Sequence, residues 1–456
     1  MPLRLREKIQ EVLPDVSARD TFLLFRGSGG SRVALCLVLA LGSQRARAAA
    51  PSDQAASPTP DDAATSDARA GRVESGVPVG QAVVDQATRE VGAFPGAFNI
   101  PGTSVYLRLG GFARFNAAHN WSALGSDDRF VVSSIPVEGD AAAGEGPRST
   151  FSVAQTRLSF DSRMPSAWGL MRTYLEADFY GSGNTLRIRH AYGQVGPLLL
   201  GQTWSTFTDA RVSPEQIDFE GIDGSIKVRQ PMARVTVAPV RWYSASLALE
   251  ANQAQVTGGV AAAHVPDLLA RVLIEGDWGL LLVSGVARKL SVESAADPSK
   301  HAATTGVGVS VAGWFPLPFL SAGGDVVAGL TFGRGISRYL VGPSGAAAAE
   351  GGKDVIYDAE ANVARALPVA GGFVALRVFW LSNLRSTLCY SGVSIDNFAG
   401  MPAQSYAQTH YGSLNLIYSP VERVDVGVEL LAGSRRNDDG AWGSATQSQV
   451  AATWRF

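Results

Sequence analysis

The fold is decided by the stretch SVYLRLGGFARFNA, residues Ser104–Ala117, in which apolar and polar side chains alternate. Val105 and Leu107 fall on one side of an extended chain, while Tyr106 and Arg108 fall on the other. Such alternation indicates a half-buried β-strand, because successive side chains of a strand point to opposite faces. The stretch is therefore predicted to be a strand with one apolar and one polar face.

The same alternation recurs along the chain up to its last residue. The further stretches with this pattern are 154–162, 170–181, 186–195, 198–204, 230–238, 242–250, 267–275, 278–288, 304–314, 325–333, 355–366, 372–381, 406–418, 424–432 and 446–456. We therefore predict about sixteen strands of roughly ten residues, the length that a tilted strand needs to cross a bilayer.

The connections between these stretches favour a closed transmembrane barrel. Compact connections such as DSRMPSAWG alternate with long, Gly-rich ones such as LVGPSGAAAAEGGKD, and outer-membrane barrels have one end of each kind. In lipid every backbone amide must be paired, which a closed sheet achieves and an open sheet does not. The predicted fold class is an all-β, transmembrane, antiparallel up-and-down β-barrel; a large soluble β-sandwich or propeller with the same period is the alternative.

Aromatic side chains gather near the ends of the predicted strands, as they do in the girdles of membrane barrels. Those predicted to lie at the membrane interface are Tyr180, Trp242, Trp278, Trp314, Trp380, Tyr418 and Trp454. The chain has no apolar run of the roughly 18 residues that a transmembrane helix needs. The aromatic positions therefore add to the prediction of a barrel that crosses with strands.

The chain before residue 97 is predicted to target and link the barrel. The apolar run VALCLVLALG, Val33–Gly42, follows basic residues and leads into an Ala-rich exit, which is typical of a secretory signal. Residues 1–50 are therefore predicted to be a cleaved signal peptide with an unusually long region before its apolar core. Residues 51–96 are rich in Ala, Pro, Ser and Asp and are predicted to be a disordered or short helical linker. The barrel domain is predicted over residues 97–456.

No motif predicts catalysis, a metal or a cofactor. The five His lack a metal-ligand spacing such as H-E-x-x-H, and no G-x-S-x-G stands near a plausible triad. The formal net charge of -2 gives no indication of a nucleic-acid partner. We therefore predict that the protein is not an enzyme, while an outer-membrane barrel enzyme of the lipid hydrolase type stays the alternative function.

Arginines are concentrated in the first half of the predicted barrel, mostly on its polar faces. A charge facing lipid at the membrane midplane would cost about 2–4 kcal/mol, so these side chains are expected to face the lumen or the rim. There they either attract anions or pair with acids as structural ladders, and the sequence leaves both roles open. The predicted pore-lining, solute-binding residues are Arg108, Arg114, Arg157, Arg172, Arg187, Arg189, Arg229, Arg234, Glu176 and Asp178.

One long stretch interrupts the alternation within the predicted barrel. It contains WSTFTDARVSPEQIDF, residues Trp204–Phe219, and is rich in acids. Such a loop either covers the outer mouth or folds inward, where its acids would face the wall arginines and create a transverse field. We predict an inward-folding constriction loop, with an exposed polar loop as the alternative. Its predicted functional residues are Asp209, Glu215, Asp218 and Glu220.

The chain ends on QVAATWRF, residues Gln449–Phe456, which is another alternating stretch. Val450, Trp454 and Phe456 are predicted to face lipid, whereas Arg455 is predicted to face the lumen. A last strand must pair with the first to close a barrel, so this end is not expected to fray.

Several segments, taken in order, resemble the DcaP-like outer-membrane porins. They are GAFNIPGTSVYLRLGGFARF, FVVSSIPVEG, TRLSF, YLEADFYG, LRIRHAYGQ, GQTWSTFTD, PEQIDFEG and RQPMARV. The resemblance runs from about Ala97 to Phe456. It implies a sixteen-stranded, homotrimeric porin of the Gram-negative outer membrane that passes small hydrophilic solutes and favours anions such as dicarboxylates.

The resemblance also implies roles for single residues. It places lumen arginines around the constriction, and the matching positions are Arg157, Arg172, Arg187 and Arg189. It further implies that Phe456 is the terminal aromatic by which the barrel assembly machinery recognises the chain. Members of the family can carry a coiled coil before the barrel, but residues 51–95 lack sustained heptads.

Overall fold

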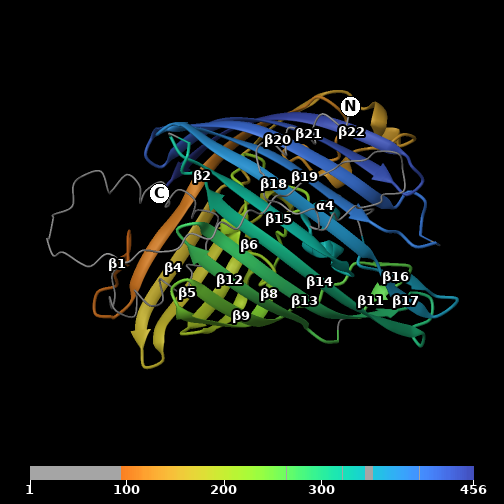
Figure 1. The fold of residues 1–456 in the computed structure, drawn as a ribbon, viewed down its shortest axis with the longest axis horizontal. Coiled ribbons are helices and arrows are strands. Elements are labelled where there is room, and N and C mark those ends of the chain that lie inside the picture. The colour runs from red at the N-terminus through yellow and green to blue at the C-terminus, as the bar shows by residue number, and fades with distance from the viewer. Residues whose placement is uncertain (1–93, 263, 321, 345–352, 400) are drawn as a thin grey trace, which may run out of the picture. The chain divides into compact units, whose positions relative to one another are not determined.

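The computed structural model describes residues 94–262, 264–320, 322–344, 353–399 and 401–456, whose main element is a closed β-barrel (Figure 1). The predicted signal peptide and most of the predicted linker lie outside the described residues. Within the described residues, no helix is both long enough and apolar enough to cross a membrane.

Sixteen antiparallel strands form the wall in chain order. They are β2 (Tyr106–Asn120), β4 (Arg157–Ser166), β5 (Gly169–Asp178), β6 (Arg187–Val195), β7 (Leu198–Trp204), β8 (Arg229–Val240), β9 (Tyr243–Glu250), β12 (Asp267–Gly276), β13 (Gly279–Glu293), β14 (His301–Pro316), β15 (Gly324–Arg334), β18 (Pro368–Leu381), β19 (Leu384–Ile395), β20 (Tyr406–Val421), β21 (Val424–Asn437) and β22 (Trp442–Arg455). A short strand, β3 (Arg148–Ser152), pairs with β2 beyond the part of β2 that pairs with β4. The predicted fold class is confirmed.

The ring closes where the last strand pairs with the first. β22 runs along β2 from Phe112 opposite Arg455 to Asn120 opposite Gln447. The amide of Phe456 then donates a further hydrogen bond to the carbonyl of Gly111 at 3.1 Å. The end of the chain is therefore part of the wall, as its alternation predicted.

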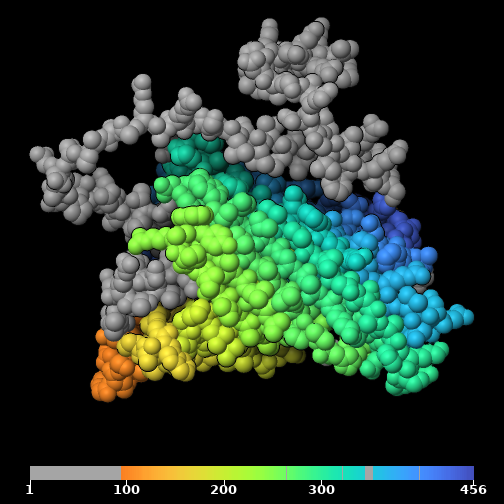
Figure 2. Space-filling model, turned by 60° about the horizontal axis from the view of Figure 1, so that its bottom comes forward, coloured from red at the N-terminus to blue at the C-terminus, as the bar shows by residue number. Residues whose placement is uncertain are grey.

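Side-chain exposure on the wall follows the predicted alternation. On β22, Val450 and Trp454 are 46% and 48% exposed, whereas Gln449 and Thr453, the residues directly before them, are buried. Polar residues thus line the lumen and apolar residues cover the outside, as in a barrel surrounded by lipid. The space-filling view shows the outer wall running without a gap from the yellow-green to the blue strands (Figure 2).

Most of the predicted interface aromatics lie on the outside near the short-turn end. Trp242, Trp278, Trp380, Tyr418 and Trp454 are 47–58% exposed. Two assignments were wrong. Tyr180 points inward, where its hydroxyl bonds Asp128 and its ring stacks on Phe219, and Trp314 packs inside the barrel beside Val212. Position near a strand end does not reveal to which side an aromatic points.

The predicted number of strands is right, although one predicted stretch was wrong and one wall strand was missed. Residues 355–366 are not a wall strand: β16 (Val355–Asp358) and β17 (Val363–Ala366) form a hairpin that joins β10 (Val256–Thr257) in a separate small sheet. The prediction missed β19, because its outward face interrupts the large side chains Leu384, Leu388 and Tyr390 with Ser and Gly. The short remaining elements are β1 (Phe98–Asn99), β11 (Val260–Ala261) and η3 (Ser182–Asn184).

The connection between β7 and β8, residues 205–228, folds into the barrel, as predicted; we call it the constriction loop. It contains η4 (Ala210–Val212) and fully buries Phe207, whose carbonyl accepts from Ser284 on β13 at 2.8 Å. Because its apolar residues pack against the wall, the loop crosses the lumen instead of covering the mouth.

Two further long connections also fold inward. The connection after β15 contains η5 (Ser337–Tyr339) and α4 (Val341–Ser344), and Leu340 forms a β-bridge with Ile226 of the constriction loop. The connection after β2 contains η1 (Val132–Ser134) and η2 (Ala141–Gly144), and it buries Phe130 against Tyr411. Their polar, Gly-rich composition does not indicate this inward fold, which a few buried apolar side chains produce.

Candidate functional site: a basic cavity beside the constriction loop

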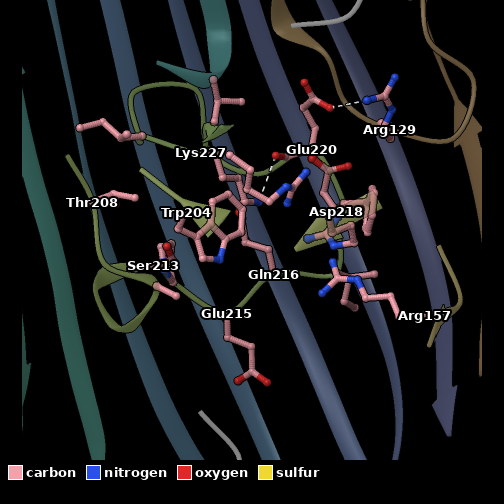
Figure 3. A pocket seen from close by; sticks show the side chains of 18 of the residues that line it. Arg129, Arg157, Trp204, Thr208, Ser213, Glu215, Gln216, Asp218, Glu220 and Lys227 are labelled. Atoms are coloured by element: carbon pink, nitrogen blue, oxygen red, sulfur yellow. Dashed lines mark hydrogen bonds and ion pairs between the residues drawn. The ribbon is translucent and has the colours of Figure 1, made fainter. Parts of the chain in front are cut away.

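A cavity of about 440 Å³ lies between the constriction loop and the wall around β2, β4, β6 and β8 (Figure 3). Its lining contains nine cationic and three acidic side chains. The cations are Arg114, Arg129, Arg157, Arg187, Arg189, Lys227, Arg229, Arg377 and Arg455; the acids are Glu215, Asp218 and Glu220. The cavity is therefore a strongly cationic place in the lumen.

The constriction loop is fixed to the wall by bonds to residues of β19 and β21. The Glu429 carboxylate on β21 accepts hydrogen bonds from the amides of Ile217 at 2.8 Å and Asp218 at 2.5 Å. Glu215 receives two bonds from Arg385 on β19, at 2.8 and 2.7 Å. The loop is thus anchored to β19 and β21, and Arg377 on β18 and Arg455 on β22 also line the cavity.

Five of the eight predicted arginines line the cavity, and acids behind it hold two of them. Arg187 donates to both oxygens of Asp178 at 2.9 and 2.8 Å. Arg189 bridges Glu176 at 2.8 Å and Asp178 at 2.9 Å. A register shift between β5 and β6 turns both Arg189 and His190 inward, which simple alternation could not predict. The predicted Glu176 and Asp178 are buried and act as the partners of these arginines.

The other three arginines of the cavity are paired less closely with carboxylates. Arg157 lies 3.6 Å from Glu176, a carboxylate that Arg189 already binds closely, and it also faces the Phe219 ring. Arg114 donates to the carbonyl of Ile217 in the constriction loop. Arg229 stacks over Trp204 at 4.5 Å and has no acidic partner among the described residues. Arg157 is therefore only partly neutralised, and Arg114 and Arg229 form no ion pair among the described residues.

The remaining predicted arginines lie away from the cavity. Arg172 binds both oxygens of Asp161 at 2.8 and 2.9 Å, and Arg163 binds the same carboxylate. Arg108 approaches this carboxylate to 3.7 Å and is partly exposed. Buried Arg234 donates to the carbonyl of Trp204 at 3.4 Å. The geometry therefore favours the structural ladder for Arg172 and a role outside the cavity for Arg108 and Arg234.

The sequence-based prediction missed four cations of the cavity: Arg129, Lys227, Arg377 and Arg455. Arg377 and Arg455 occupy lumen-facing positions on β18 and β22. The alternation predicted that Arg455 faces the lumen, but not that it belongs to the site. Arg129 and Lys227 lie in connections, where no alternation exists to indicate direction. Their positions follow from the inward fold of two loops.

Three of the four predicted loop acids reach the cavity, and each has a protein partner. Glu220 accepts from Arg129 at 2.7 Å, and Asp218 accepts from the Phe130 amide at 3.0 Å and from Gln449 at 2.9 Å. Glu215 is held by Arg385. Asp209 instead binds Arg211 at 2.9 Å and Arg271 at 3.4 Å, outside the cavity.

Burial changes the titration of the loop groups that face the cavity. It raises the pKa of the Asp218 and Glu220 carboxyls above their ordinary values. It also lowers the pKa of Lys227, whose ammonium donates to the Glu220 carbonyl at 3.0 Å, to about 8. The loop therefore changes its charge within an accessible pH range.

A closed sixteen-stranded antiparallel barrel with an inward loop beside a charged, polar-lined lumen defines an outer-membrane porin. The chain belongs to the DcaP outer membrane protein family, whose family model matches residues 100–450. Its location is therefore the outer membrane. No match is found among curated proteins.

Two solved structures share this fold. The outer membrane channel DcaP of Acinetobacter baumannii is 24% identical with a TM-score of 0.69, over 79% of this chain and 99% of that chain. The anion-selective porin from Comamonas acidovorans is 12% identical with a TM-score of 0.51, over 77% of this chain and 100% of that chain. At these identities the likeness is one of fold.

Proposed function

We propose that this porin lets small hydrophilic anions, such as dicarboxylates, diffuse passively between the constriction loop and the basic wall. The observation that carries the proposal is a lining of nine cations and three acids in which Arg114 and Arg229 form no ion pair among the described residues. Cationic side chains in a narrow lumen concentrate anions and exclude cations. The selectivity of the anion-selective porin with a similar fold agrees with this assignment.

Dicarboxylates fit the way in which the guanidinium groups are arranged. Arg157, Arg229 and Arg114 approach the cavity from β4, β8 and β2, so two separated carboxylates could each meet a guanidinium group. Single-channel current through the purified protein in a planar bilayer should fall when succinate is added to KCl. Glycerol at the same concentration should have no such effect, and equal effects of both would contradict the proposed anion site.

The same proposal covers export and assembly. Residues 1–50 would be removed as a signal peptide, residues 51–96 would link to the barrel, and the mature protein would form a homotrimer in the outer membrane. Diffusion through the lumen requires no bond to be broken, and we propose no catalytic activity and no cofactor. The rival function, a barrel hydrolase, predicts turnover of a lipid ester by the purified protein.

Anion preference is expected to decrease with rising pH through a single lysine. Since the pKa of Lys227 is about 8, its charge disappears between about pH 6 and about pH 10. The raised pKa values of Asp218 and Glu220 act in the same direction, because these carboxyls are neutral in acid and become anionic as the pH rises. Reversal potentials across a pH series measure the effect.

Two variants separate the contribution of Lys227 from that of the acids. Lys227→Arg should keep anion preference constant above neutral pH, since Arg does not titrate there. At every pH above neutral, Lys227→Met should show the lower anion preference that the wild type shows at high pH. An unchanged pH profile in both variants would exclude Lys227 as the titrating group.

The terminal aromatic is expected to matter for assembly far more than for stability. Phe456 is 59% exposed, so its removal costs little packing within the barrel. If the ring is the signal that the barrel assembly machinery recognises, deletion of Phe456 should strongly reduce heat-modifiable barrel in the outer membrane. Phe456→Tyr should restore the yield, and a normal yield after deletion would contradict the role.

A further inference from the structure

A second group of cations faces outward, away from the lumen. Lys289 on β13, Arg334 on β15 and Arg436 on β21 are exposed on the lipid side of the wall. On β13 and β15 they continue the outward rows that contain Val283 and Phe332. Among the described residues of the wall strands, Glu293 is the one acid that shares this outward phase. The outward-facing charge of the wall is therefore mainly positive.

Lys289 and Arg334 lie at the height where the apolar band ends on the side of the long loops. Lys289 pairs with Thr305 and Arg334 with Val307, both on β14. Below them on β14, Phe315 contacts the exposed Trp278, with ring centroids 6.2 Å apart, near the short-turn end. The ten steps from Phe315 to Thr305, at about 3.4 Å each and tilted by about 40°, rise about 26 Å, which matches an apolar band about 25 Å tall.

The two side chains can reach one ligand. One strand, β14, separates β13 from β15, and the β14 partners of Lys289 and Arg334 are two residues apart, so their backbones are about 12 Å apart. Long cationic side chains at such a boundary extend toward the polar headgroups. Among the described residues, neither has a side-chain hydrogen bond or an ion pair, so the protein does not neutralise them.

We propose that Lys289 and Arg334 form a binding site on the outer wall for a phosphorylated glycolipid headgroup of the outer leaflet. The long loops mark this end of the barrel as the outer one. A cation facing hydrocarbon is unfavourable, and a lipid phosphate at the boundary supplies the missing partner. A diphosphorylated glycolipid offers two such groups to the two cations, with Thr305 between them as a hydroxyl donor. This site depends on the outer-membrane location and not on the selectivity of the pore.

The test measures retention of diphosphoryl lipid A by the full-length detergent-solubilised protein, using native mass spectrometry. The wild type should bind lipid A, and Lys289→Gln with Arg334→Gln should weaken binding roughly thirtyfold, since each cation near anionic headgroups contributes about fivefold. Arg241→Gln, which removes an exposed cation at the short-turn end, should leave binding unchanged. Enzymatically dephosphorylated lipid A should bind the wild type as weakly as diphosphoryl lipid A binds the double variant.

Several outcomes would overturn the site. They are equal binding of lipid A to the wild type and the double variant, no discrimination by the wild type against the dephosphorylated lipid, and equal retention of phosphatidylglycerol. If the double variant loses its oligomeric state but retains lipid as the wild type does, this part of the outer wall contacts another copy of the chain. That result would also overturn the lipid site. The reversal potential should be the same in the double variant, so failure of the lipid site and failure of the proposed pore function are distinguishable.

Discussion

Replacing Arg157 and Arg229 together by Gln is expected to lower the anion-to-cation permeability ratio about tenfold. These two side chains line the cavity from β4 and β8 with incomplete or no neutralisation. Their loss removes two positive charges from a narrow lumen where an ion passes within a few ångströms of the wall. Reversal potentials of the variant and the wild type in the same KCl gradient measure the change.

The choice of this pair keeps the effect on folding small. Without Arg157, the Glu176 carboxylate still binds Arg189, and without Arg229 no acid among the described residues loses a partner. Replacing Arg187 and Arg189 would instead leave the fully buried Asp178 without a counterion, which is strongly destabilising. Arg436→Gln removes one positive charge from the outer wall and should not change permeability. If the pore variant behaves like this control, the cavity does not set selectivity.

Glu429→Ala is expected to release the central part of the constriction loop. The mutation leaves the buried amides of Ile217 and Asp218 without their acceptor, at about 1–3 kcal/mol for each amide. A loss of this size shifts the loop toward other positions by tenfold or more, and the pore should become more conductive, noisier and less selective. Single-channel recordings measure the change in conductance and noise. Limited proteolysis of the assembled barrel measures how accessible the released loop has become.

A conservative variant distinguishes anchoring from charge. Glu429→Gln removes the negative charge but keeps a side-chain oxygen that can accept from the loop, so conductance should stay near that of the wild type. If Gln and Ala variants are equally noisy, the charge of Glu429, and not its hydrogen bonds, determines the loop position. If neither differs from the wild type, the loop is held by other contacts, such as those between Glu215 and Arg385.

The sequence reveals those features of the fold that are repeated and hides those that occur once. Alternation predicts the wall because each strand repeats the same in-out pattern. It fails where the outward face is weak, as in β19, where a hairpin imitates it, as in residues 355–366, and where the register shifts, as in β6. The inward fold of the connection after β2 depends on a few apolar residues, such as Phe130, which pack against distant strands. No local pattern records such contacts.

The candidate site shows the same division. Wall arginines such as Arg157 and Arg187 could be predicted from the cost of charge in lipid, whereas Arg129 and Lys227 depend on how the loops fold. The lumen-facing position of Arg172 could be predicted, but its bidentate pairing with Asp161 is a property of the register between β4 and β5. Sequence thus indicates which charges face the lumen, and structure decides which of them remain available to a solute.

The central claim, that the basic cavity makes this porin prefer anions, is tested most directly by the reversal potential of the purified wild-type protein. The measurement uses a planar bilayer with a KCl gradient at neutral pH. The cavity predicts a potential of the sign that a chloride-preferring channel produces. A potential near zero, or one of the sign that potassium preference produces, would contradict the account.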